Sequence, residues 1–191
     1  MKLLYEFIPR LDFLNSAEAV KDLVDGWNIT DSAGGTPAPG ATAVAGVLKM
    51  KYPDKVAIPM LITNYKGPVE IAAVALAAEA MGVDGMIPDP GDPPKYGHLI
   101  RTREDGSCQI ISNPDEVGEF RRSTGPAEEV TGFLRNTIKV KKLKIGCLLT
   151  ARRPVESAIA RISDGWNFCF FLRLDEGSLP KLKELAAVCK Q

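Results

Sequence analysis

The sequence predicts an α/β fold in which a parallel sheet is built from about six strand–helix units. Strand-like apolar runs alternate along the whole chain with segments whose apolar residues have helical spacing. The sequence Asp-Gly-Trp-Asn occurs at residues 25–28 and again at 164–167, each time where a predicted helix gives way to a predicted strand. The strand at 82–87 leads into a loop rich in proline, glycine and acidic residues, which is typical of a ligand-binding strand end.

The elements follow in order from apolar periodicity and from glycine and proline positions. Asn15 or Ser16 is expected to cap the first helix, and Ser178 is expected to cap the last. The fourth strand is expected to end at about Pro88, because proline has no backbone N–H to donate to a neighbouring strand. Glycine and charge between two apolar runs predict a hairpin insertion around 98–112. Strands are expected at 3–8, 27–30, 56–63, 82–87, 144–149 and 166–174, and helices at 17–24, 41–48, 68–81, 130–138, 155–162 and 178–189.

Two architectures accommodate six units in a single domain spanning 1–191. A doubly wound open sheet would use them all, whereas a (β/α)8 barrel of ~250 residues would be two units short. Glu6 in the first strand and Asp92 after the fourth are both acidic at or near loop ends. Polar groups from several strands converge at the mouth of a barrel, which favours the barrel.

Composition excludes several classes of function. Lysine plus arginine equals aspartate plus glutamate at 24 each, so no bulk charge attracts nucleic acid or an anionic membrane. No two of the four cysteines are close in sequence and only one histidine is present, so no metal site is predicted. No signal peptide is recognised and no apolar run approaches the ~20 residues of a membrane span, so a cytoplasmic location is expected.

Glu6 and Asp92 are the candidate catalytic groups. A carboxylate among apolar neighbours, such as Glu6, is costly to bury unless it is paired or exchanges protons, so a general acid and a structural salt bridge are the two interpretations. Asp92 lies in a stiff loop after Gly91, which allows close approach to a ligand, and stabilising the turn is its alternative role. The small-residue loop 33–36 is either a cradle for a phosphate or a flat ring, or a plain connection. Arg152 and Arg153 are an anion site or surface residues.

Four segments resemble motifs of the methylenetetrahydrofolate reductase family. Glu6-Phe7-Ile8-Pro9 is similar to its first strand, and Ile29–Thr36 to its V-T-x-G-A-G-G-S loop. Ile58–Leu61 is similar to its A-P-H-L-T-C segment, and Gly91–Pro94 to its R-G-D-x-P loop. The four occur in the family's order over residues 4–94, and the resemblance weakens from 145 to 189. The chain is therefore identified as a short, divergent member of that family.

The resemblance implies a flavin-binding (β/α)8 TIM barrel, here truncated to about six βα units, that reduces a methylene-tetrahydropterin to its methyl form in one-carbon metabolism. Glu6 would protonate the pterin, and Asp92 would lie near flavin and pterin. FAD is the expected cofactor, with FMN or no flavin as alternatives, and tetrahydrofolate or a related pterin is the expected substrate. The residues implied to bind the cofactor are Thr30, Ala33, Gly34, Gly35, Met60, Thr63 and Gly91.

Departures from the family pattern define the alternatives. Met60 replaces a histidine, Pro90 an arginine, and the last two βα units are absent. A flavin-free, pterin-binding or partner subunit of a one-carbon enzyme complex is the main alternative, and another pterin-dependent enzyme, such as a methyltransferase component, is a third. Open barrel edges promote aggregation, so a homo- or hetero-oligomer is expected to cover them.

Overall fold

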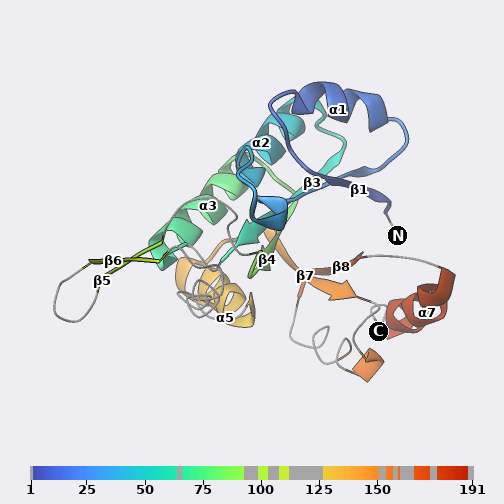
Figure 1. Cartoon of the computed structure of the whole chain (residues 1–191). Helices are drawn as coiled ribbons and strands as arrows, with labels where there is room; N and C mark the ends of the chain where they lie inside the picture. The colour runs from blue at the N-terminus through green and yellow to red at the C-terminus, as the bar shows by residue number, and fades with distance from the viewer. Residues whose placement is uncertain are drawn as a thin grey trace.

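A six-stranded parallel sheet, curled into a half-barrel, forms the centre of the molecule (Figure 1). The computed structural model describes residues 2–63, 66–92, 99–102, 108–111, 127–150, 154–156, 159, 166–172 and 176–188. The strands are β1 (Leu4–Phe7), β2 (Gly26–Ile29), β3 (Val56–Ile62), β4 (Gly85–Asp89), β7 (Lys144–Thr150) and β8 (Phe168–Leu172).

The strands follow one another across the sheet in chain order, β1-β2-β3-β4-β7-β8, and every neighbouring pair is parallel. A doubly wound sheet reverses its strand order at a switch point, whereas a barrel does not. The order therefore decides between the two architectures that the residues alone left open, and the fold is α/β and TIM-barrel-like.

Helices cover the convex side of the sheet. They are α1 (Phe13–Val20), α2 (Ala41–Lys51), α3 (Pro68–Ala80), α5 (Ala127–Gly132), which continues as the π-helical η2 (Phe133–Ile138), and α7 (Leu179–Val188). The short 3-10 helices are η1 (Ala33–Gly35) and η3 (Glu176–Ser178). Where the sequence predicts a hairpin, β5 (Leu99–Thr102) and β6 (Cys108–Ile111) pair antiparallel as a separate two-stranded sheet.

The two faces of the sheet differ because successive strand side chains point to opposite sides. The face toward the helices is the main core, in which Trp27, Ile29, Leu61 and Met86 are fully buried. The inner face carries a smaller apolar cluster of Val56, Ile58 and Ile87, against which partly buried side chains pack, namely Leu4, Leu148, Phe168 and Phe170. The interior of the half-barrel is thus apolar and only partly covered.

A recurring contact sets the register of the strands. Asp25 precedes β2, and its Oδ2 accepts a hydrogen bond from the Leu3 amide at the start of β1, at 2.7 Å. Asp84 precedes β4 and accepts from the Ala57 amide of β3 at 2.9 Å. Asn167 precedes β8, and its Oδ1 accepts from the Ile145 amide of β7, also at 2.9 Å. Each of these three joints therefore fixes the start of the preceding strand. Asp25 and Asp84 are both followed by the glycine that opens the next strand, whereas Asn167 is the fourth residue of the Asp-Gly-Trp-Asn repeat, so the shared contact does not follow the repeat residue by residue.

Two local predictions are wrong. Helix α1 begins at Phe13, before Asn15 and Ser16, and no side chain caps it. Strand β4 continues through Pro88 to Asp89. The carbonyl of Asp89 faces β3, so the missing donor of Pro88 faces β7, and the β4–β7 pairing involves only Gly85 and Met86. Pro88 therefore removes no hydrogen bond from the observed pairing between β4 and β7.

The remaining elements agree with the predicted pattern. Ser178 is buried at the junction of η3 and α7. The predicted helix 155–162 lies mostly outside the described residues, and the single-domain assignment of 1–191 stays a prediction. Every helix in the described ranges is too short or too polar to cross a bilayer.

Candidate functional site

Charged and polar residues gather at the carboxyl edge of β2, β3 and β4. Asp31 follows β2, Lys66 lies between β3 and α3, Asp89 ends β4, and Asp92 follows it. This edge of a parallel sheet is where barrel enzymes place their catalytic loops. The sequence prediction of a site at the end of the fourth strand therefore points to a real concentration of charge.

An ion pair forms the best-defined part of this edge. Lys66 Nζ lies 3.2 Å from Asp31 Oδ2, and the two side chains are only 21% and 14% exposed. The Ser32 hydroxyl lies 3.5 Å from the other oxygen of Asp31, within reach of a weak hydrogen bond. A partly buried ammonium beside a carboxylate can bind an anionic substrate group and exchange a proton with it. Sequence reasoning missed both residues, because a single charge after a strand is a common surface feature.

Asp92 reaches across to the loop after β2. Its Oδ2 accepts a hydrogen bond from the Gly34 amide at 2.8 Å, although the two residues are 58 positions apart. The next two amides are also occupied, since Gly35 donates to Ser32 O at 2.9 Å and Thr36 donates to Ala33 O at 3.4 Å. The loop that sequence reasoning offered as a phosphate cradle therefore holds a carboxylate of the protein itself, and a phosphate would have to displace Asp92.

Thr30 and Thr63 tie neighbouring strand ends together. The amide and hydroxyl of Thr30 both donate to Phe7 O, at 2.9 and 3.4 Å. Those of Thr63 both donate to Asp89 O, again at 2.9 and 3.4 Å. Both threonines are buried. Their observed contacts are structural, and their implied contact with a flavin stays a prediction.

Gly91 and Met60 have local roles that need no ligand. Gly91 has φ +79°, and a Cβ there would lie 2.8–3.0 Å from the side-chain carbons of Ile62. Its amide donates to Asp89 Oδ2 at 2.9 Å. Met60 is half-buried and lies opposite Ile87 in the β3–β4 register. Gly91 is therefore required by backbone conformation and packing, which also explains how the β4 loop folds back over β3.

Glu6 does not have the environment that the sequence pattern suggested. Its side chain is exposed, because β1 is an edge strand of the sheet and the inner face is open there. The argument from an apolar environment is wrong for this residue, and its role as an acid stays a prediction. Its register partner on β2, Asn28, is fully buried and donates to Ile58 O at 3.2 Å.

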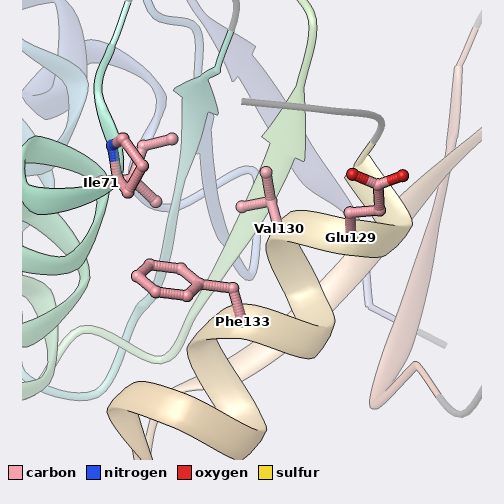
Figure 2. Close-up of a pocket in the computed structure, with 5 residues that line it drawn as sticks. Ile71, Glu129, Val130 and Phe133 are labelled. Carbon is pink, nitrogen blue, oxygen red and sulfur yellow. The ribbon is translucent and has the colours of Figure 1, made fainter. Parts of the chain in front are cut away.

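An apolar cavity of about 260 Å3 lies outside the sheet, between α3 and the α5–η2 segment (Figure 2). Figure 2 shows Val130 and Phe133 extending toward Ile71, with Glu129 to one side. Pro68, two residues after Lys66, completes the lining. In the described part of the chain no group of three or more histidine, cysteine or acidic side chains could hold a metal ion. The proposed anion site at Arg152 and Arg153 lies outside the described residues.

No protein-family model matches the sequence, and no curated protein matches it. Among solved structures, the chain is similar to 2,3-dimethylmalate lyase, a PEP mutase/isocitrate lyase superfamily member, with 15% identity and a TM-score of 0.50. The alignment covers 96% of this chain and 62% of the lyase. A structure from Aquifex aeolicus VF5 matches at 15% identity and a TM-score of 0.51, covering 98% of this chain and 72% of that one. At this identity the likeness concerns the fold.

These findings correct the resemblance to the methylenetetrahydrofolate reductase family. Of the two similar structures named above, the one whose name states an activity is a lyase of a different superfamily, and no family model supports the reductase assignment. The predicted flavin-dependent oxidoreductase is therefore wrong, and so are the one-carbon and folate terms attached to it. The four matching segments are short and lie within or just after β1, β2, β3 and β4. Barrels of different families share such strand and loop patterns, because the same sheet edge imposes similar turn chemistry.

Proposed function

We propose that this chain is a carbon–carbon lyase whose substrate is a 2-hydroxydicarboxylate of the malate type. The observation that carries the proposal is the partly buried Lys66–Asp31 pair at the carboxyl edge of the half-barrel. The fold likeness to 2,3-dimethylmalate lyase supports the class of reaction. The chain spans 62% of the length of that lyase, so activity and substrate are both part of the proposal.

The ion pair supplies the two functions that such a cleavage needs. The Lys66 ammonium binds a carboxylate of the substrate in a charge-assisted hydrogen bond. Asp31 then accepts the proton of the substrate hydroxyl as a general base. Asp92 positions the Ala33–Gly35 loop at the same edge through its bond to the Gly34 amide.

The reaction balances within the substrate. As the hydroxyl proton moves to Asp31, the C2–O bond becomes a carbonyl and the C2–C3 bond breaks. The electron pair of that bond forms the enolate of the departing carboxylic acid, which takes up a proton at carbon. With 2,3-dimethylmalate the products would be pyruvate and propionate, and no external oxidant or reductant is required.

The experiment is to incubate the purified chain with 2,3-dimethylmalate and with malate, with and without added divalent cations. The 2-oxo acid is measured by a coupled dehydrogenase assay and both products by NMR. Lys66→Met and Asp31→Asn should each lower kcat/KM at least 10-fold, since a hydrogen bond to a charged group contributes ~1.5–3 kcal/mol. Lys142→Met and Asp54→Asn are the matched controls, because they change exposed residues that precede β7 and β3, at the amino edge of the sheet. Absence of 2-oxo acid from both substrates under all conditions would refute the proposal.

We also propose that the sheet edges β1 and β8 are covered by a partner, either a second copy or a different chain. Leu3, Tyr5 and Ile8 on or beside β1 are exposed, and Phe168 and Phe170 on β8 are only partly buried. An exposed apolar edge strand is a template for pairing. Such a partner would bring the half-barrel closer to a full (β/α)8 barrel.

A further inference from the structure

Two cysteines from different strands lie side by side on the helix-facing side of the sheet. Cys147 on β7 and Cys169 on β8 are directly opposite one another in the parallel register. Their sulfur atoms are 3.5 Å apart, the distance of a thiol–thiol contact. The two residues are 22 positions apart and show no sequence signature of a pair, so the register alone brings them together.

The two thiols differ in accessibility. Cys147 is 1% exposed and belongs to a small core with Leu149 and Leu185. Cys169 packs at the edge of that core and is partly exposed. One sulfur can therefore meet a reagent from solution, while the other is held beside it. This is the arrangement of an attacking and a resolving thiol.

The strand geometry allows a covalent bond between them. Adjacent strands lie ~4.8 Å apart, and disulfides join residues whose Cα atoms are ~4.4–6.8 Å apart. Residues directly opposite each other on neighbouring strands fall within that range. The sulfurs are 3.5 Å apart and need to approach by about 1.5 Å to reach the ~2.05 Å of a disulfide bond, a change that a rotation about χ1 supplies.

We propose that Cys147 and Cys169 form a redox modification site that takes up a small-molecule disulfide as oxidant and closes into a β7–β8 disulfide. The Cys169 thiolate attacks one sulfur of the reagent, forming a mixed disulfide and releasing one thiol. The Cys147 thiolate then attacks the Cys169 sulfur and releases the second thiol. The protein loses two thiol protons, and the reagent is reduced to two thiols, so atoms and electrons balance.

The bond would act on the carboxyl edge of the sheet. Thr150 and Leu172, the last residues of β7 and β8, are three residues beyond the cysteines and are register partners. A covalent link three residues away fixes this part of the edge. Because Cys169 is partly exposed, the bond should also be accessible to reductants, which is typical of a labile disulfide.

The test uses the unmodified chain, reduced and then incubated with oxidised glutathione. Trypsin separates all four cysteines, placing Cys147 in peptide 145–152 and Cys169 in peptide 162–173. The expected result is a mass loss of about 2 Da per chain and a reducible cross-link between these two peptides. Treatment with dithiothreitol should restore the mass of the reduced chain and release the two peptides from the cross-link.

Three outcomes overturn the proposal. A stable glutathione adduct on Cys169 without the cross-link would show that Cys147 does not resolve it, and a cross-link to Cys108 or Cys189 would assign the chemistry elsewhere. Cys147→Ala should convert the cross-link into a persistent adduct on Cys169. The double variant Cys108→Ser and Cys189→Ser should still form the bond, and its failure to do so would count against the proposed pair.

Discussion

Replacing Asp84 with alanine tests how the half-barrel fixes the start of its strands. The Asp84 carboxylate accepts a hydrogen bond from the Ala57 amide at 2.9 Å and lies 3.0 Å from Lys49 Nζ. Ala57 is fully buried, whereas Lys49 and Asp84 are partly exposed, at 19% and 33%. The substitution therefore leaves one buried amide without its acceptor and one lysine without its counterion.

The expected cost follows from these two losses. An unsatisfied buried amide costs ~1–3 kcal/mol, and a partly exposed ion pair contributes up to ~1 kcal/mol. Asp84→Ala should therefore lower the free energy of unfolding by about 3 kcal/mol, whereas Asp84→Asn, which keeps an acceptor for Ala57, should cost about 1 kcal/mol. For a chain of this size, 3 kcal/mol corresponds to a Tm decrease of ~6–12 °C.

Urea unfolding followed by far-UV circular dichroism measures the difference. Asp54→Ala is the control, because Asp54 is exposed, and its free energy of unfolding should lie within ~0.5 kcal/mol of that of the unmodified chain. Equal losses for Asp84→Ala and Asp84→Asn would show that the charge, and not the acceptor for Ala57, is responsible. No loss for either would refute the role of the joint in setting register.

Three further predictions concern other parts of the molecule. Hydrogen bonds from Lys21 and then from Tyr52 hold the pKa of Glu18 at about 2, below its ordinary 4.5. These contacts therefore stabilise the fold fully above pH 4.5, and their contribution is lost as the pH falls toward 2. An NMR titration of Glu18 with a midpoint near 4.5 would contradict this. Gly146→Ala places a Cβ 2.2 Å from the Phe168 ring and should lower the free energy of unfolding by ~1–3 kcal/mol. Gly40→Ala is the control, because a Cβ at residue 40 meets nothing within 4 Å. Equal stability of the two variants would be inconsistent with this packing. Light scattering of the purified chain should give a mass of at least two chains if a second copy covers the edges, and a monomer at high concentration would rule out the second copy. A monomer that also elutes alone from gel filtration of the cell extract would rule out a different chain as well.

Much of the fold is predictable from local signals. The six strands lie within a few residues of their expected positions, because glycine and proline mark their ends and apolar periodicity marks their interiors. Strand order could not be obtained in this way, since it depends on which edges pair over long distances. The failure at Pro88 has the same origin, because a proline is tolerated wherever its missing donor meets no paired neighbour.

The placement of some residues of the candidate site was predictable, whereas their roles stay predictions. Placing Asp92 and the Gly34 loop at one edge follows from parallel strands ending together, and the 2.8 Å bond between them agrees with it. Glu6 was misjudged because alternation gives the side of a strand on which a residue lies but not whether that side is covered. Lys66 and Asp31 carry no pattern of their own, so only their spatial proximity identifies them.

The joints at Asp25, Asp84 and Asn167 have a consequence for how the chain folds. Each bonds to a residue only 22 to 27 positions away, at the start of the strand just before it. The sheet is therefore assembled from contacts between neighbouring units, which close shorter loops than contacts across the whole chain would. During synthesis from the N-terminus, β1 can be aligned on β2 as soon as the first joint leaves the ribosome, before β3 has been made. The joints before β4 and β8 would then align β3 and β7 in the same way as those strands are completed.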